Sequence, residues 1–319
     1  MEKKFKQAFD KIKKANNILL VTHTRPDGDG LASVCAIAEL LEQINKPYSA
    51  YCYDTPPFQY DFLPHLEKIT SDKDALNFSQ FDLIIVLDCG DLSRTKLDNE
   101  ILNRNSNQFI IEFDHHPKVD DYANIEIRDP NTSSTSELIY DFLKVNKVKI
   151  NKNIASCILT GIASDTNFFF FPNTSNKTID IASAMLKYGV RLPQIVEHTW
   201  RNKSLGAMKI WGKAISNLII NKKYNLACSI LSEEDLDGSE ISREELEGIS
   251  EFLSNIENVK GVLLIREENG QIRGNLRSNH VDIDISILAK KLGGGGHAKA
   301  SGFTIDGKLE KTGGSWRIV

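Results

Sequence analysis

Residues 17–45 read NILLVTHTRPDGDGLASVCAIAELLEQIN and predict a buried strand, a polar turn and a helix in direct succession. The strand is an unbroken apolar run, and apolar residues recur with helical spacing from residue 30 to residue 45. The turn between them carries His23, Asp27 and Asp29. Because a strand, a short turn and a helix form the repeating unit of a parallel sheet, the stretch predicts the first unit of an α/β fold.

This alternation continues through the first half of the chain. Further strands are expected at residues 48–54, 81–91, 108–116 and 123–129, and helices at 134–146, 153–166 and 179–190. We therefore predict a mostly parallel sheet flanked by helices, in which ligands bind beyond the carboxyl ends of the strands.

The length of 319 residues exceeds what one hydrophobic core usually organises, so two domains are expected. The pattern predicts a catalytic domain at residues 1–190, a connecting helical segment at 191–221 and a smaller α/β domain at 222–319. The smaller domain is expected to contain an acidic helix, a hairpin, a second helix and a glycine run, at residues 243–256, 259–279, 284–292 and 293–296.

Composition excludes several classes of function. The formal net charge of −4 argues against a broad surface for long duplex nucleic acid, although a small anionic ligand fits a local site. No apolar run approaches the roughly 20 residues that span a bilayer, and the charged amphipathic N-terminal helix lacks the apolar core of a signal peptide. The five cysteines are odd in number and show no CxxC spacing, which predicts free thiols in a reducing cytoplasm.

The polar residues after the first two motif-bearing strands allow two interpretations. The mixture of nitrogen and carboxylate donors at His23, Asp27 and Asp29 suits a divalent transition metal, but Pro-Asp-Gly is also ordinary turn chemistry. Asp88 follows the strand LIIVL directly, where a helix-capping carboxylate is the alternative. Asp91 fits the capping role better, so Asp88 is the better ligand candidate.

The third strand ends in FDHHP, which places Asp114, His115 and His116 at the same predicted sheet edge. An exposed histidine pair is the alternative, but it does not explain the placement at a strand end. Asp165 lies among small and apolar residues, where a carboxylate needs a partner or a metal. Together these segments predict a site for two metal ions that share one carboxylate, with the ligands His23, Asp27, Asp29, Asp88, His115 and Asp165.

The ordered segments HTRPDGD, LDCGD, DHH and GIASDT resemble motifs I to IV of the DHH phosphoesterase superfamily. The C-terminal LRSN and GGGGHAKASGF resemble the DHHA1 domain that accompanies it, so the resemblance covers nearly the whole chain. Length and domain pairing are most similar to the stand-alone NrnA-type members, which degrade short oligoribonucleotides and dephosphorylate 3′-phosphoadenosine 5′-phosphate (pAp). The resemblance implies an active site in the cleft between the two domains.

The resemblance also assigns roles at the metal site. It implies that His23 and Asp27 bind one Mn²⁺, that Asp29, His115 and Asp165 bind the other, and that Asp88 bridges them. Mg²⁺ or another divalent cation also fits these donors. His116 would face the scissile phosphate and Asp114 would orient its neighbours, while a water made acidic by both ions attacks phosphorus.

The C-terminal domain carries candidate substrate-binding residues. Glycines let the backbone approach an anion closely and turn its N–H groups toward it, although a flexible loop is the alternative. By resemblance, Arg277 and His297 hold the terminal phosphate or base of the substrate, with Ser278 assisting. The predicted clamp comprises Arg277, Ser278, Gly294, Gly295, Gly296 and His297.

Other polar and aromatic segments are expected to be structural. Arg94 and the run NTSST at residues 131–135 lie where turns and helix caps are expected, although they are close enough to the motifs to touch substrate. FFFF at residues 168–171 is expected to be a buried strand, with one phenylalanine near Asp165 as a candidate for base stacking. Structural roles are also expected for His65, His198 and His280.

The sequence therefore predicts a metal-dependent hydrolase that cleaves short oligoribonucleotides (nanoRNA, dinucleotides) to mononucleotides and converts pAp to AMP. A phosphodiesterase of cyclic dinucleotides or of pApA is the main alternative. A RecJ-like single-strand exonuclease, a family-II-like pyrophosphatase and a non-catalytic nucleotide-binding regulator fit less well. Short RNA or nucleotides are the expected partners, long duplex nucleic acid and membranes are not, and a homodimer is left open.

Overall fold

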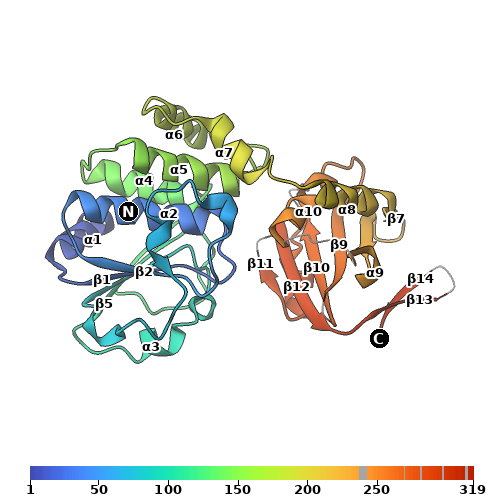
Figure 1. Cartoon of the computed structure of the whole chain (residues 1–319), viewed down its shortest axis with the longest axis horizontal. Coiled ribbons are helices and arrows are strands. Elements are labelled where there is room, and N and C mark those ends of the chain that lie inside the picture. The colour runs from blue at the N-terminus through green and yellow to red at the C-terminus, as the bar shows by residue number, and fades with distance from the viewer. Residues whose placement is uncertain (237–242, 269, 281, 297, 313–314) are drawn as a thin grey trace. The chain divides into compact units, whose positions relative to one another are not determined.

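The computed structural model describes residues 1–236, 243–268, 270–280, 282–296, 298–312 and 315–319. The chain divides into two compact units, Met1–Arg201 and Asn202–Val319 (Figure 1). No helix in the described part of the chain is both long and apolar enough to cross a membrane.

The first unit is built on a six-stranded sheet whose neighbouring strands all pair in parallel, as the sequence predicts. The strand order is β3-β2-β1-β4-β5-β6. The strands are β1 (Ile18–Val21), β2 (Tyr48–Tyr51), β3 (Ile69–Thr70), β4 (Leu83–Leu87), β5 (Phe109–Asp114) and β6 (Ile125–Arg128).

Helices cover both faces of this sheet, with α4 and α5 on one side and α3 on the other (Figure 1). Alternate residues of β1 enter two separate cores, because successive side chains of a strand point to opposite faces: Leu20 packs in one and Leu19 in the other. The α-helices of the unit are α1 (Glu2–Lys14), α2 (Gly28–Gln43), α3 (Asp98–Leu102), α4 (Thr135–Val145), α5 (Lys152–Asp165), α6 (Asn176–Leu186) and α7 (Leu192–Thr199). Four short 3₁₀ helices complete it: η1 (Phe58–Tyr60), η2 (Leu66–Lys68), η3 (Phe78–Gln80) and η4 (Leu92–Thr95).

The strand order reverses between β1 and β4. The chain moves outward from β1 to β2 and β3, and then returns to the other side of β1 to continue through β4, β5 and β6. In parallel α/β sheets the loops diverge at such a reversal and leave a crevice at the carboxyl ends of the two strands. The motifs that follow β1, β4 and β5 therefore meet at the position where this fold class binds its ligands.

The second unit contains a mixed six-stranded sheet in the order β11-β12-β10-β9-β8-β7. β8 and β9 are parallel and all other neighbours are antiparallel, with the predicted hairpin formed by β9 and β10. The strands are β7 (Ile219–Asn221), β8 (Leu226–Leu231), β9 (Gly261–Glu268), β10 (Gln271–Arg277), β11 (Gly295–Gly296) and β12 (Ala300–Asp306), with a separate β13 (Leu309–Thr312) and β14 (Ser315–Ile318) pair. The helices are α8 (Leu205–Ser216), α9 (Glu233–Leu236), η5 (Arg243–Leu246), α10 (Ile249–Leu253) and α11 (Ser286–Lys291).

Three local expectations differ from the structure. The helix expected at residues 243–256 is divided into η5 and α10, because Gly248 adopts a left-handed φ of 92° that a continuous helix does not allow. The buried strand expected at 168–171 is absent, and these residues lie in a turn after α5. Positive φ angles at Phe168 and Phe169 direct the chain away from a sheet and leave Phe170 82% exposed.

The helices expected at residues 191–221 are divided between the two units. α7 belongs to the first unit and α8 to the second, and the chain passes from one unit to the other at Arg201.

Gly161 lies where α5 packs against α2 and α4. A Cβ atom built there would lie 1.9 Å from Ser136 Oγ and 2.5 Å from Asp29 Oδ1. Gly212, in the middle of α8, has no atom within 4 Å of the equivalent position. The two glycines therefore have different roles although both lie inside helices.

We expect Gly161→Ala to lower the free energy of unfolding by about 1–3 kcal/mol, because the added methyl group overfills a closely packed interface. Gly212→Ala is the matched control, and should raise stability by up to about 1 kcal/mol through its better helix propensity. Urea unfolding of both variants measures the difference. Equal stability of the two variants would contradict this account of the α2–α5 interface.

Candidate active site

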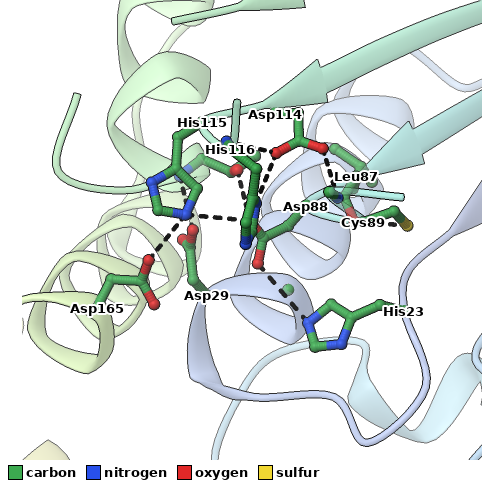
Figure 2. A network of polar contacts seen from close by, with 12 residues as sticks. His23, Asp29, Leu87, Asp88, Cys89, Asp114, His115, His116 and Asp165 are labelled. Atoms are coloured by element: carbon green, nitrogen blue, oxygen red, sulfur yellow. Dashed lines mark hydrogen bonds and ion pairs between the residues drawn. The ribbon is translucent and has the colours of Figure 1, made fainter. Parts of the chain in front are cut away.

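The carboxyl ends of three adjacent strands bring the predicted polar side chains together (Figure 2). His23 lies two residues beyond β1, and Asp88 follows β4 directly. β5 ends at Asp114, and His115 and His116 follow it. Because β1, β4 and β5 are parallel neighbours, these residues reach one edge of the sheet from segments far apart in the sequence.

Two helices contribute the remaining carboxylates. Asp27 is the N-cap of α2, where its Oδ1 accepts hydrogen bonds from the backbone N–H groups of Asp29 and Gly30. Asp29 lies in the first turn of α2 and is fully buried, while Asp165 is the last residue of α5. The turn chemistry at Asp27 is therefore real, and it directs the same oxygen toward His23 Nε2 at 3.6 Å.

These side chains form one group that contains Asp88 and a second that Asp88 approaches through His115, and ligand atoms of Asp88, His115 and His116 also lie within 4.8 Å of one another. In one group, His23 Nε2 lies 3.8 Å from Asp88 Oδ2, and ligand atoms of His23, Asp27 and Asp88 all lie within 4.8 Å of one another. In the other, ligand atoms of Asp29, His115 and Asp165 meet the same limit, and His115 Nε2 lies 3.0 Å from Asp165 Oδ2. Asp88 Oδ1 lies 3.5 Å from His115 Nε2, so the two oxygens of one carboxylate face the two groups.

The N-terminus of α4 fixes two of these carboxylates. The backbone N–H groups of Thr135 and Ser136 donate to the two oxygens of Asp29, at 2.6 and 3.0 Å. The Thr135 hydroxyl donates to Asp88 Oδ1 at 2.7 Å. Ser134 caps the helix, as expected for this hydroxyl-rich run, but the bonds from Thr135 into the cluster were not predicted. A helix N-terminus favours nearby negative charge, so the start of α4 stabilises the carboxylates of Asp29 and Asp88.

Burial of like charges changes the protonation of the cluster. Burial, together with the carboxylates of Asp29 and Asp27, raises the pKa of Asp88 well above its usual range. Burial and the neighbouring Asp165 raise the pKa of Asp29 to about 7. Burial opposes the protonated form of His115, but its hydrogen bond to Asp165 and the surrounding carboxylates raise its pKa to about 9.

The donor set fits divalent cations. Imidazole nitrogens and carboxylate oxygens are ligands of Mn²⁺, Zn²⁺ and Fe²⁺, and three of the four carboxylates are largely buried beside one another. Such a cluster is costly unless protons or cations neutralise it, and the raised pKa values are the consequence when protons do so. Each group offers three ligands of mixed type, as a metal site requires.

His116 is held in a different way. Its Nδ1–H donates to Asp114 Oδ1 at 2.7 Å, and its backbone N–H donates to the same oxygen at 2.8 Å. The other oxygen of Asp114 accepts from the backbone N–H of Gly90 at 2.7 Å. Burial opposes ionisation of Asp114, but its bond to His116 and the charge of Arg128 hold the pKa of this carboxyl below its usual range. Asp114 therefore fixes the orientation of the His116 ring.

Arg94 was expected to lie in a capping turn, and the structure places it beside the cluster. Asp91 caps η4, in agreement with its predicted role, by accepting from Ser93 N at 2.7 Å. Arg94 Nη1 donates to the carbonyl of Cys89 at 3.1 Å, and Nη2 lies 2.7 Å from His23 Nδ1. The only sequence signal for this position was its spacing of six residues from Asp88.

In the second unit, Arg277 and Ser278 line a cavity of about 320 Å³ between the start of β9 and the end of β10. Arg277 pairs with Glu251, to which its Nε donates at 2.8 Å, and its Nη1 donates to the carbonyl of Leu276. The buried hydroxyl of Ser278 donates to the Lys260 carbonyl at 2.7 Å, so it already has an internal acceptor. His297, the last residue of the predicted clamp, lies outside the described residues.

The second half of the glycine run forms an edge strand. Gly295 and Gly296 form β11 and pair with Gly302 and Ser301 of β12. A Cβ atom at Gly294 would lie 2.1 Å from the Gly302 carbonyl oxygen, so close backbone packing accounts for one of the glycines. At Gly295 the equivalent position is open, and β11 is an outer strand of its sheet.

The three histidines expected to be structural all contact protein groups. His65 Nε2 lies 2.7 Å from Glu39, His280 Nε2 lies 2.9 Å from the Val259 carbonyl, and the His198 ring packs on Phe62.

Comparisons with known proteins agree with this architecture. The N-terminal domain of the DHH family matches residues 17–162, and the DHHA1 domain matches residues 221–312. The chain is 31% identical over 301 residues to the probable bifunctional oligoribonuclease and PAP phosphatase NrnA of Streptococcus mutans, covering 93% of this chain and 92% of that protein. It is 29% identical over 294 residues to the bifunctional oligoribonuclease and PAP phosphatase NrnA of Bacillus subtilis, covering 91% and 90%.

The chain also resembles the crystal structure of an exopolyphosphatase-related protein from Bacteroides fragilis, with a TM-score of 0.88, 25% identity and coverage of 95% and 91%. The chain belongs to the DHH family and carries its DHHA1 domain. The predicted family, fold class and enzyme class, a DHH hydrolase, are confirmed. Enzymes of this family are metal-dependent phosphoesterases, which agrees with the donor set at the sheet edge.

We expect the affinity for Mn²⁺ to rise with pH between about pH 6 and pH 9, by about tenfold per pH unit for each proton released. The pKa of His115 is about 9 and that of Asp29 about 7, so both must lose a proton before they bind a cation. Calorimetric titrations in buffers of different ionisation enthalpy count the released protons.

His115→Gln should reduce the number of protons released on Mn²⁺ binding. His65→Gln is the matched control, because His65 pairs with Glu39 in place of the cluster, and it should leave proton release unchanged. An affinity independent of pH would contradict the role given to His115.

Proposed function

We propose that this protein hydrolyses short oligoribonucleotides to mononucleotides and pAp to AMP, with two divalent cations, most suitably Mn²⁺. The observation that carries the proposal is the pair of ligand groups at the reversal point of the sheet, with Asp88 in the first and 3.5 Å from His115 of the second. The relatives named for oligoribonuclease and PAP phosphatase activity, which match along nearly the whole chain, support this choice of substrate.

His23, Asp27 and Asp88 would hold one cation, and Asp29, His115, Asp165 and Asp88 the other. Two bound divalent cations neutralise the phosphate and supply an acidified water at neutral pH. The protein's own contribution is to keep these donors at fixed positions before the substrate arrives. The bonds from α4 to Asp29 and Asp88 do so.

His116 would act on the phosphate. Its Nδ1–H is fixed by Asp114, so the ring presents its opposite edge, Nε2, for the reaction. A protonated imidazole at that position donates a hydrogen bond to a phosphate oxygen as negative charge accumulates there. The bond from the Gly90 backbone N–H to the other oxygen of Asp114 keeps this carboxylate from turning away from the His116 ring.

The second unit would bind the far end of the substrate through Arg277. Its guanidinium is held by Glu251 through Nε and Nη2 and by the Leu276 carbonyl through Nη1, so its position is set before binding. A guanidinium is suited to two parallel hydrogen bonds with phosphate oxygens.

We also propose a cytoplasmic location. The five cysteines are all free thiols, which is consistent with a reducing compartment.

We expect wild-type protein with Mn²⁺ to hydrolyse pAp, pApA and RNA of two to about five nucleotides, and to lose this activity with a chelator. The panel should also contain cyclic di-AMP, longer RNA and single-stranded DNA, with products separated by chromatography. Asp88→Asn should lower kcat by about 1,000-fold or more, because it removes the charge shared by both groups. Preference for long DNA, or unchanged turnover of Asp88→Asn, would overturn the proposal.

We expect Arg277→Gln to raise KM for pAp and pApA by about tenfold, with Mn²⁺ affinity unchanged, because a charged hydrogen bond to phosphate is lost. Arg273→Gln is the matched control, since Arg273 lies on the same strand and also pairs with a carboxylate, that of Glu268. Its KM should stay within about twofold of wild type. Equal effects of the two variants would argue against a phosphate contact by Arg277.

A further inference from the structure

A second charged network lies directly behind His116, and no motif identified in the sequence includes it. Its centre is Arg128, the last residue of β6, whose side chain is only 6% exposed. Arg128 lies opposite Asp114 in the parallel pairing of β5 with β6. The strand register therefore places a buried guanidinium beside the carboxylate that holds the His116 ring.

The guanidinium contacts residues 114–117 at two backbone carbonyl oxygens and at one carboxylate. Nη1 donates to the carbonyl oxygen of His116 at 2.7 Å and lies 3.3 Å from that of Pro117. Nη2 lies 3.3 Å from Asp114 Oδ2, the oxygen that the imidazole does not use. Arg128 therefore contacts the backbone of His116 directly and reaches its ring through Asp114.

Two further residues fix the guanidinium in this position. Nη2 donates to Glu112 Oε1 at 2.7 Å, and the Tyr122 hydroxyl donates to the same oxygen at 2.5 Å. Glu112 lies two residues before Asp114 on β5, so both carboxylates point to the same face of the sheet. Both are almost completely buried, and Glu126 Oε1 also lies 3.3 Å from Arg128 Nε, so one guanidinium faces three carboxylates in a region with little water.

We propose that Arg128, supported by Glu112 and Tyr122, is a positioning residue that sets the place and orientation of His116. The proposal rests on the proposed function, in which His116 acts on the phosphate. A planar guanidinium can hold a carbonyl and two carboxylates at once, whereas an ammonium group is a single point that cannot span all three. Without the Arg128 guanidinium, His116 would stay bonded to Asp114, but the two residues would shift together.

Arg104 provides a matched control in the same unit. Its Nη1 donates to the Ile101 carbonyl at 3.1 Å, and its Nη2 donates to the Tyr122 carbonyl at 3.2 Å. It is thus a partly buried arginine that holds two backbone carbonyls, as Arg128 does, and its described bonds reach the network only at the backbone of Tyr122, not at Asp114 or His116. If the loss of a partly buried guanidinium acted only through stability, substitution of Arg104 should lower kcat as much as substitution of Arg128.

The test compares Arg128→Lys with Arg104→Lys in the full-length Mn²⁺-loaded protein, using pAp and pApA. For Arg128→Lys we expect kcat to fall by about 10- to 100-fold, with KM and Mn²⁺ stoichiometry within about twofold of wild type, because small displacements of a reacting group reduce kcat. Arg104→Lys should keep wild-type kcat. A kcat of Arg128→Lys within about twofold of wild type would overturn the proposal.

A double-variant cycle separates positioning from stability. If Arg128 acts through Asp114 and His116, Arg128→Lys should reduce kcat by no more than about threefold when Asp114→Asn is already present, whereas independent effects would multiply. If Arg128→Lys does not fold, the pair Arg128→Gln with Glu112→Gln removes both buried charges together and is tested in the same way. If the reductions in kcat from the two substitutions multiply in the double variant, the proposal is contradicted.

A readout that does not require turnover distinguishes this proposal from the proposed function. The proton that His116 Nδ1 donates to Asp114 should give a downfield NMR signal, assigned by its loss in His116→Gln. This signal should shift or broaden in Arg128→Lys and stay unchanged in Arg104→Lys. If the wild type hydrolyses none of the substrates while the signal responds to Arg128, the proposed function fails and the positioning role stands. An unchanged signal in Arg128→Lys overturns the positioning role.

Discussion

Asp88 places one buried carboxyl group within 4 Å of the imidazoles of His23, His115 and His116, where burial and the neighbouring carboxylates raise its pKa well above the usual range. One oxygen faces His23 and the other faces His115, and the Thr135 hydroxyl donates to the second oxygen. The residue also adopts a left-handed φ of 61°, a conformation that costs a non-glycine residue about 1–3 kcal/mol. The chain accepts this cost at the reversal point of the sheet, where the loops after β1 and β4 diverge.

The elements around Asp88 supply opposite partial charges or fixed hydrogen bonds. The N-terminus of α4 donates to Asp29 and Asp88, while Arg128 lies behind Asp114 and the backbone of His116. The first arrangement holds carboxylates that would otherwise repel one another, and the second holds an imidazole. Both are buried, so their electrostatic interactions are weakened little by water. A site prepared in this way needs little reorganisation when a phosphate arrives, which is the main requirement of phosphoester hydrolysis.

Sequence reasoning succeeded where the signal was local and periodic. The parallel sheet, the β9–β10 hairpin and the strand-end motifs follow from apolar runs that end in polar turns. It failed at FFFF, because four apolar residues satisfy a strand pattern although left-handed φ angles at Phe168 and Phe169 form a turn. It also joined η5 and α10 into one helix, since Gly248 lowers helix propensity without excluding a helix. Arg128 gave no signal and Arg94 only its closeness to Asp88, because an arginine in a polar segment has no characteristic spacing.

By itself, the sequence determined the fold class, the family and the order in which acidic and imidazole groups leave the strands. The fold class and the order of these groups depend on hydrophobic periodicity and turn chemistry, which act over a few residues, while the family follows from the resemblance of the ordered motifs. Only the tertiary structure decided that Asp88 faces both histidines, that α4 supports Asp29, and that Arg128 meets Asp114 across β5 and β6. Such contacts join residues up to more than a hundred positions apart, and strand order and register, which no local pattern encodes, bring them together.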